Sequence, residues 1–299
     1  MSFSGNIKSE ICSFYPENGC CIKAKCYGMM LFSAKFGVDS ILFKTENKDI
    51  ANHYYELVKK VCNVELDVFP PESERGMYHV CTDDADKCKI ILDVFGHSEK
   101  ELHLRINRSN IENECCFGAF VSGVFLSCGS VSDPNKAYHA EFLVSKKHLA
   151  NDLIAVLGEC ISAPKCTLRK SSNVLYYKES EKIEDLLTLV NAVKSVFELM
   201  NVKIYKDMRN HINRTSNCIT ANISKTTESM RKQMDAIELI DKKIGLEALP
   251  SDLYDMAIVR RDNDYASLSE LGKLMVPPLS RSGVNHRLNR IVDIAKGLE

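Results

Sequence analysis

The sequence has no long apolar run and no leader-like segment, and these absences limit where the protein works. No stretch of the 299 residues approaches the ~20 consecutive apolar residues that a membrane-spanning helix needs. The first residues, MSFSGNIKSEIC, are polar and lack the apolar centre of a secretory signal. We therefore expect a cytoplasmic protein with no membrane partner. With 45% hydrophobic and 26% charged residues, the composition is typical of a globular chain of about two domains.

Cysteine is abundant, but metal-binding spacings are missing. The chain has 13 cysteines and no CxxC pair; its closest groups are Cys20, Cys21 and Cys26, and the adjacent Cys115 and Cys116. These spacings do not match the usual structural zinc patterns, and no histidine has a metalloprotease-like spacing to an acid. Free cysteine is among the most buried residue types, and cytosolic thiols stay reduced. The sequence therefore favours buried thiols over metal ligands, and we expect no metal and no cofactor.

Positive charge is local although the net charge is only −1. Residues 1–200 carry 23 Lys and Arg against 27 Asp and Glu, whereas residues 201–220 carry four against one. Between Lys273 and Lys296, five basic residues face Asp293 alone. Cations gathered on one segment suit a module that binds double-stranded DNA better than a protein that coats nucleic acid everywhere.

Residues 201–222 combine four Lys and Arg with five Asn and show little periodicity, so they predict a basic linker. Lys203, Arg209 and Arg214 are candidate phosphate contacts, because dense cations make affinity for DNA salt-dependent. The alternative is that the asparagines only cap or turn the chain.

Residues 266–294 predict two short helices joined by a sharp corner. Ser267 and Glu270 form the sequence pattern of a capping box, which opens the first helix. Pro277 and Pro278 cannot continue that helix, since each lacks an N–H and restricts the residue before it. Ser280 is a good N-cap for the second helix.

The second helix has an apolar and a polar face. Val284, Leu288 and Ile291 fall at i, i+4 and i+7, which is one helix face. The opposite face is hydrogen-bonding and cationic, as in a helix-turn-helix that offers its second helix to the major groove. The candidate DNA-binding residues are Lys273, Ser280, Arg281, Ser282, Asn285, His286, Arg287, Asn289 and Arg290. The alternative is an ordinary helical hairpin with a solvated face, and the segment alone leaves both interpretations open.

An internal repeat organises residues 1–200, with copies at about 17–108 and 112–200. Each copy begins with an apolar helical run, Cys21 to Phe36 and Cys116 to Val131. Gly28 corresponds to Gly123 at an offset of 95, and Ala51 to Ala150 at 99, so four extra residues fall in the turn with Asp133 and Pro134. We expect a pseudo-twofold α+β (α/β) domain, in which the two glycines let the first helices approach closely.

Further elements follow from the local patterns. We expect strands at Ser40–Thr45 and His139–Val144, extended stretches at Val64–Phe69, Lys87–Val94, Lys165–Lys170 and Asn173–Lys178, and helices near Glu99–Ile106 and Ile183–Met200. Residues 223–299 predict an all-α domain: a helix from Ile223 to Ile244 that ends at Gly245, a helix from Asp252 to Arg260 capped by Ser251, and the two helices of residues 266–294.

The tandem units, with GVFLSCGSV at Gly123–Val131 in a motif helix, resemble the LAGLIDADG homing-endonuclease fold, whose repeat is α-β-β-α-β-β-α. Only one clear strand follows each motif helix in the sequence. The resemblance implies that the last acidic residue of each motif helix would bind catalytic Mg²⁺. Aligned on the motif glycines, these positions hold Ser33 and Cys128, which are not the anionic oxygen ligands that Mg²⁺ prefers. The resemblance therefore implies the fold without the nuclease activity.

The whole chain resembles the WhiA family of bacterial transcriptional regulators. The resemblance lies in SFSGNIKSE (2–10), CCIKAK (20–25), GSVSDPNKAYHAEF (129–142), RNHINRTSNCITAN (209–222) and SLSELGKLMVPPLSRSGVNHRL (267–288). It implies a degenerate LAGLIDADG domain joined to a C-terminal helix-turn-helix, and a nucleoid-associated regulator of sporulation and cell division that binds promoter DNA. It favours the helix-turn-helix interpretation of residues 266–294.

Two other classes of function stay open in the sequence. A divergent nuclease could use the acidic cluster Asp83, Asp84 and Asp86, although like charges in a run are usually a solvated loop. Alternatively, the acidic first 200 residues would serve an adaptor that contacts RNA polymerase, a sigma factor or another regulator, because a net charge of −4 disfavours a large phosphate footprint. Because the duplication already supplies pseudo-symmetry, we expect a monomer.

Overall fold

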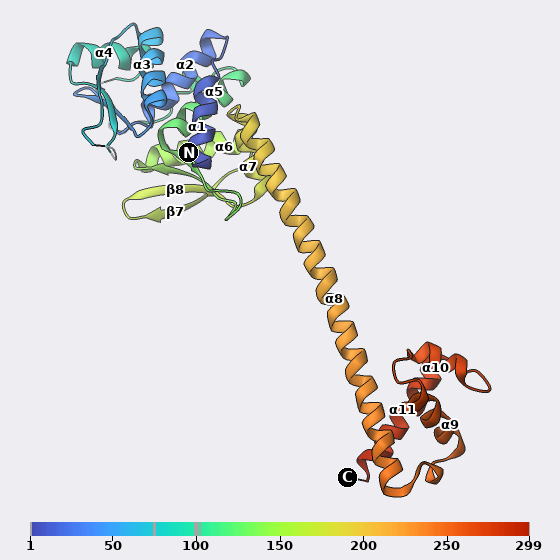
Figure 1. Cartoon of the computed structure of the whole chain (residues 1–299). Helices are drawn as coiled ribbons and strands as arrows, with labels where there is room; N and C mark the ends of the chain where they lie inside the picture. Colours follow the sequence, from blue (N-terminus) through green and yellow to red (C-terminus); the bar gives the residue numbers. More distant parts are fainter. Residues whose placement is uncertain (1, 74–75, 99–100, 102, 299) are drawn as a thin grey trace. The chain divides into compact units, whose positions relative to one another are not determined.

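The computed structural model describes residues 2–73, 76–98, 101 and 103–298. The chain divides into two compact units, Met1–Asp207 and Met208–Glu299, and Figure 1 shows the elements of each. Among the described residues, no helix combines the length and the apolarity that crossing a membrane would require.

The first unit contains two repeats of seven elements each, preceded by a helix. In chain order the elements are α1 (Phe3–Ser13), α2 (Gly19–Leu31), β1 (Lys35–Phe36), β2 (Ile41–Thr45), α3 (Lys48–Cys62), β3 (Asp67–Phe69), β4 (Tyr78–Thr82), α4 (Ala85–Val94), the 3₁₀ turn η1 (Arg108–Asn110), α5 (Glu114–Cys128), β5 (Gly129–Val131), β6 (Ala140–Val144), α6 (Lys147–Cys160), β7 (Lys165–Arg169), β8 (Ser172–Tyr177), α7 (Ser180–Leu189) and the first part of α8 (Val193–Ile244). Each repeat therefore has the order α-β-β-α-β-β-α, and the predicted LAGLIDADG-like fold class is confirmed.

Each repeat forms one antiparallel four-stranded sheet. The strand orders are β1-β2-β4-β3 and β5-β6-β8-β7, so the two sheets share one topology. In the first sheet Ile41 pairs with Thr82, and in the second Ala140 pairs with Tyr177. The link between the first two strands is residues 37–40 in one copy and 132–139 in the other, so the four extra residues lie where the sequence predicted them.

Helices α2 and α5 pack against each other at the centre of the unit (Figure 1). A Cβ on Gly28 would collide with the carbonyl oxygen of Phe120, and a Cβ on Gly123 with that of Lys25. Only glycine permits this approach of the two backbones, so the predicted role of both glycines is confirmed. Ser127 on α5 donates a hydrogen bond to the carbonyl of Met29 on α2, at 2.8 Å.

Four of the predicted elements of this unit need correction. The apolar runs that were expected to be helical through Phe36 and Val131 end instead in the short strands β1 and β5. Lys87–Val94 is helical, not extended, because Cys88, Ile91 and Leu92 bury one helix face and Asp84 caps the first turn; the strand of this region is β4. The helix expected near Glu99–Ile106 lies partly outside the described residues, and residues 103–106 are not helical.

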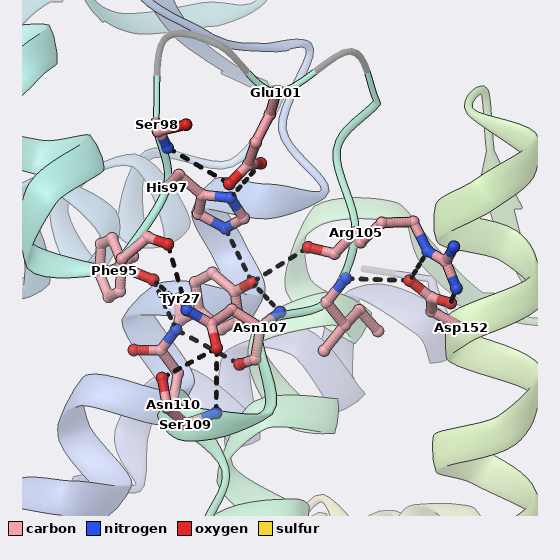
Figure 2. Close-up of polar contacts among 12 residues, drawn as sticks. Tyr27, Phe95, His97, Ser98, Glu101, Arg105, Asn107, Ser109, Asn110 and Asp152 are labelled. Carbon is pink, nitrogen blue, oxygen red and sulfur yellow. Dashed lines mark hydrogen bonds and ion pairs between the residues drawn. The ribbon is translucent and has the colours of Figure 1, made fainter.

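Polar side chains hold the segment between the repeats against α2 and α6 (Figure 2). The buried hydroxyl of Tyr27 lies 2.9 Å from Nε2 of His97 and accepts a 2.7 Å hydrogen bond from the backbone N–H of Asn107. Asp152 on α6 accepts two hydrogen bonds from the guanidinium of Arg105, at 2.6 and 2.8 Å, and a third from the N–H of Ile106. These contacts fix the connector that joins one repeat to the next.

The second unit contains the remainder of α8, the 3₁₀ turn η2 (Leu246–Ala248), α9 (Ser251–Asp262), α10 (Leu268–Leu274) and α11 (Arg281–Lys296). Its core is made by Ala236, Ile237, Ile240, Leu246, Leu249, Leu253, Met256, Ala257, Leu271, Met275, Val284, Leu288, Ile291 and Ala295. The predicted helix end at Gly245 is confirmed, since its φ of 79° lies in the left-handed region that glycine favours.

Three other predicted elements need correction. Residues 201–222 are not an irregular linker but part of α8. The helix expected over Ile183–Met200 is two helices, α7 and the start of α8, with Asn191 between them at a φ of 61°. Ser251 does not cap α9 but is its first residue, after the N-cap residue Pro250.

Candidate nucleic-acid interface

Helix α10 begins with the predicted capping box. The Ser267 hydroxyl accepts a hydrogen bond from the N–H of Glu270, and the Glu270 carboxylate accepts one from the N–H of Ser267, at 2.8 Å. The hydrogen bond that the carboxylate accepts from the N–H of Ser267 is the largest cause that lowers the pKa of Glu270. The helix ends at Leu274, before Pro277, as predicted. Leu271 is fully buried in the core, so the helix has a fixed orientation within the unit.

The corner between α10 and α11 is tight because Gly272 has no side chain. The N–H of Leu279 donates a 2.8 Å hydrogen bond to the carbonyl of Gly272. A Cβ on Gly272 would collide with the carbonyl oxygen of Leu279 and lie 3.3 Å from a methyl of Val284. The absence of that atom lets the start of α11 lie directly against α10.

Helix α11 buries the predicted apolar face. Ser280 caps it by accepting a 3.2 Å hydrogen bond from the N–H of Gly283, as predicted. Val284, Leu288 and Ile291 are completely buried. Burial of each such side chain contributes about 1.5–3 kcal/mol, so the rotation of the helix about its axis is fixed. The opposite face is therefore held outward.

Most of the predicted DNA-binding residues lie on that outward face. Exposed positions are Lys273, Ser280, Arg281, Ser282, Asn285, His286, Asn289 and Arg290. The amides and the imidazole offer both donors and acceptors, and the arginines add positive charge. The first N–H groups of α11 also point outward along the helix axis, which favours an anion near Ser280.

Arg287 occupies a different place from the other candidates. Its guanidinium donates a 3.3 Å hydrogen bond to the carbonyl of Asp252 on α9, and the Asp252 carboxylate lies 3.9 Å away. Arg290 lies 3.4 Å from the same carboxylate but keeps 48% of its side chain exposed. Arg287 is thus a contact between α9 and α11, whereas Arg290 retains access to a ligand. No local pattern in the sequence indicates Asp252 as their partner.

A buried arginine, which also has no local signal in the sequence, supports the entry to α10. Arg260 on α9 is 1% exposed and donates a 2.6 Å hydrogen bond to the carbonyl of Ala266, just before the capping box. Burial lowers the pKa of this guanidinium. Arg260 lines a hollow of about 450 Å³ together with Lys225, Ser267 and Arg281.

The three predicted phosphate contacts on α8 separate into two kinds. Lys203 pairs with Glu181 at 2.7 Å and Glu184 at 3.3 Å within the first unit, and the bond to Glu181 raises the pKa of the lysine. This pairing disfavours the predicted phosphate role of Lys203. Arg209 and Arg214 are exposed on α8.

Ser33 and Cys128 line one hollow of about 420 Å³ in the first unit, at the C-terminal ends of α2 and α5. The hollow also holds Lys8, whose ammonium donates a 3.3 Å hydrogen bond to the carbonyl of Leu126. Burial lowers the pKa of Lys8 and raises that of Cys128 to about 12. Glu141 is the one acid among the described lining residues, and it pairs with Arg169 at 2.9 Å. Two lysines, one acid that is paired with an arginine, and otherwise neutral side chains thus line the hollow at the position that the homing-endonuclease fold would give to Mg²⁺.

The acidic cluster Asp83, Asp84 and Asp86 lies at the start of α4. Asp84 caps that helix by accepting hydrogen bonds from the N–H groups of Asp86 and Lys87, at 2.9 and 3.3 Å. All three acids are exposed. This cluster has a structural role in starting a helix, and it lies outside the hollow that contains Ser33 and Cys128.

Comparison with known proteins finds one family for both units. The family model of the WhiA C-terminal HTH domain matches residues 212–295, and that of the WhiA LAGLIDADG-like domain matches residues 117–209. A probable cell division protein WhiA of Alkaliphilus metalliredigens is 34% identical over 99% of this chain and 98% of its own length. The chain belongs to the WhiA family. A second WhiA relative, from Clostridium novyi, is 36% identical over 100% of this chain and 98% of its own length, and is also named a probable cell division protein.

The fold is that of a solved WhiA structure. Full-length DUF199/WhiA from Thermatoga maritima superposes with a TM-score of 0.59, covers 99% of both chains and is 24% identical. The WhiA HTH match includes all of α9 and α10 and nearly all of α11, so the helix-turn-helix interpretation of residues 266–294 is confirmed over the ordinary hairpin. The WhiA LAGLIDADG-like match covers the second repeat from Phe117 onward.

Proposed function

We propose that this WhiA-family chain is a sequence-specific transcriptional regulator of cell division and sporulation that binds double-stranded promoter DNA through α11. The observation that carries the proposal is the division of α11 into two faces: Val284, Leu288 and Ile291 are buried, and the opposite side presents Asn285, His286 and their neighbours. A recognition helix of a helix-turn-helix needs this arrangement to enter the major groove. The WhiA HTH match and the cell-division names of the relatives support the same role.

The exposed side chains suggest separate roles in binding. Asn285, Asn289, His286 and Ser282 are suited to base edges, since an amide makes a bidentate pair with adenine. Arg281 and Arg290 are suited to guanine or to phosphates. Lys273, on α10 and outside the recognition helix, is suited to the phosphate backbone, where it adds affinity without sequence information.

The test compares two exposed residues with different proposed roles. After the operator has been selected from a random duplex pool at physiological salt, Asn285→Ala should weaken binding to it by about 5- to 150-fold, because one bidentate base contact contributes about 1–3 kcal/mol of discrimination. Its affinity for a scrambled duplex should stay unchanged. Lys273→Ala should weaken binding to both duplexes by the same factor. It should also lower the slope of log affinity against log salt concentration by about one. If the two variants lost affinity equally on both duplexes, the assignment of roles would be wrong.

We also propose that the first unit does not cleave DNA. Two-metal cleavage needs carboxylates that hold the ions beside the phosphate, and here the corresponding positions are Ser33 and Cys128 with the ammonium of Lys8 beside them. Supercoiled plasmid should therefore stay intact with the protein and Mg²⁺ or Mn²⁺. Nicking by the wild type that disappears in Glu141→Gln, the one described acid of the hollow, would refute this.

A further inference from the structure

Four cysteine thiols meet where α2 and α5 begin. Cys20 and Cys21 lie in the first turn of α2, and Cys115 and Cys116 in the first turn of α5. All four sulfur atoms lie within 4.8 Å of one another. The Sγ atom of Cys20 is 3.9 Å from those of both Cys21 and Cys115. The pseudo-twofold relation of the repeats thus brings two adjacent pairs, far apart in the sequence, into one cluster.

The spacing of the thiols fits one tetrahedral ion. Zinc–thiolate bonds of about 2.3 Å place the sulfur atoms of a tetrahedral site about 3.8 Å apart. The two sulfur–sulfur distances of 3.9 Å already approach this value. The other sulfur–sulfur distances are at most 4.8 Å, so small side-chain rotations would bring them to it. An iron–sulfur cluster would insert several metal and sulfide atoms among the cysteines, and four mutually adjacent sulfurs leave no room for them. Four thiolate ligands in a tetrahedron are a usual set for structural zinc.

The N-terminal ends of α2 and α5 favour thiolates at the cluster, whereas the burial of Cys21 and Cys116 opposes them. Neither Asn18 nor Asn113 places a side-chain cap on its helix, so the first N–H groups of α2 and α5 remain available near the sulfur atoms. A helix N-terminus stabilises negative charge and lowers the pKa of a nearby thiol. Hydrogen bonds from the other cysteines lower the pKa of Cys20, whereas burial raises the pKa of Cys21 and of Cys116. Metal binding would release protons from the buried pair.

Access and closure also suit a structural ion. Cys20 and Cys115 are exposed, which gives an ion a route to the cluster, while Cys21 and Cys116 are buried against the core. Four protein ligands leave no open coordination position for water or substrate, which is the pattern of structural rather than catalytic zinc.

We propose that Cys20, Cys21, Cys115 and Cys116 bind one Zn²⁺ ion that joins the two repeats at the N-terminal ends of α2 and α5. This reverses the expectation from sequence that no metal is bound. The site is independent of the DNA-binding face of α11, and it is tested with the metal alone.

The experiment uses the full chain, purified and stripped of metal in a reducing buffer, then incubated with Zn²⁺ and desalted. The wild type should retain about one zinc per chain by elemental analysis, and Cys20→Ser/Cys115→Ser should retain less than a tenth of that. The control Cys166→Ser/Cys218→Ser also removes two exposed thiols, neither of which belongs to the cluster, and it should bind like the wild type. Circular dichroism checks that each variant is folded, which the exposure of all four substituted residues favours.

Two further measurements identify the ligands and the effect. Co²⁺ in place of Zn²⁺ should give the intense visible and near-ultraviolet bands of a tetrahedral thiolate site. Free Zn²⁺ at 100 times its Kd should raise the Tm of the first unit by about 5–10 °C in the wild type only. Any of four results would overturn the proposal. They are equal metal content in the wild type and Cys20→Ser/Cys115→Ser, an octahedral cobalt spectrum, acid-labile sulfide in the isolated protein, and retention of less than a tenth of a zinc ion per chain by the wild type.

Discussion

Replacement of Gly272 by alanine tests whether the corner of the helix-turn-helix depends on the close approach of α10 and Leu279. Replacing an exposed helical glycine by alanine usually raises the stability of the helix by up to about 1 kcal/mol. At Gly272 the new Cβ would instead meet the carbonyl oxygen of Leu279 and a methyl of Val284. Neither atom is the free end of a flexible chain, so α11 must shift away from α10.

The cost can be estimated from the contacts. Overpacking a buried position costs about 1–3 kcal/mol. The shift also weakens the 2.8 Å hydrogen bond from the N–H of Leu279 to the carbonyl of Gly272, which contributes about 1 kcal/mol. After the gain in helix propensity is subtracted, Gly272→Ala should destabilise the second unit by about 1–3 kcal/mol.

Hydrogen exchange in the full chain measures this locally, since amides of α10 and α11 report the opening of that unit. Gly272→Ala should lower their protection about 5- to 150-fold. Gly283→Ala is the matched control: its Cβ would lie 3.5 Å from the nearest atom, so it should keep or raise protection. If Gly272→Ala raised protection as much as Gly283→Ala, the close approach of Leu279 would not be a real constraint on the corner.

Two other predictions concern the core of the second unit and the connector of the first. Leu288→Ala, at a fully buried position, should destabilise the second unit by about 2–5 kcal/mol in the same exchange experiment. The control Asn289→Ala, at the next position, should change the stability by less than about 0.5 kcal/mol. Equal losses of stability in the two variants would contradict the assigned faces of α11. Burial tends to raise the pKa of Asp152, but its hydrogen bonds from Arg105 and Ile106 lower it overall, below its ordinary 3.8. The stabilisation that the ionised Asp152 carboxylate contributes is therefore complete above the pKa that Asp152 has in the unfolded chain, and it is lost as the pH falls through its pKa in the folded chain. The free energy of unfolding of Asp152→Asn should thus be lower than that of the wild type at pH 7, and the difference should shrink toward pH 3; a constant difference would contradict this cause.

The helix-turn-helix was predictable because its signals are local. Ser267, Glu270 and Ser280 are caps that act within one turn, and Val284 and Leu288 share a face through helix periodicity alone. The partner of Arg287 was not predictable, since Asp252 lies on another helix and only packing brings the two together. A helical wheel distinguishes a buried face from an exposed one, but it cannot show which exposed cation already has a neighbour.

The repeat was found from sequence, while some of its strands were not. β1 and β5 have two and three residues and directly follow apolar helices, so no alternation is long enough to separate them. The segment with Cys88 and Ile91 was misassigned because its apolar residues are dense enough to fit either period. The capping hydrogen bonds of Asp84 decide in favour of a helix there.

The cysteine cluster shows a different limit. Zinc patterns in sequence depend on ligands a few residues apart on one loop. Here each pair is an adjacent dipeptide, and the two pairs meet only because the repeats face each other across a pseudo-twofold axis. The internal repeat itself was the available signal: Cys20 and Cys21 correspond to Cys115 and Cys116 at the offset of 95 that relates Gly28 to Gly123.

The helix dipole explains why the two ends of α2 and α5 have opposite chemistry. Carboxylates at helix C-termini are unfavourable unless a cation neutralises them, so uncharged residues at these positions avoid that cost. Ser33 and Cys128 do so here, and the ammonium of Lys8 donates to the carbonyl of Leu126 in the last turn of α5. Thiolates at the N-termini are favoured by the same dipoles. The proposed absence of a nuclease site at one end and the proposed zinc site at the other are therefore both consistent with the charge distribution of one helix pair.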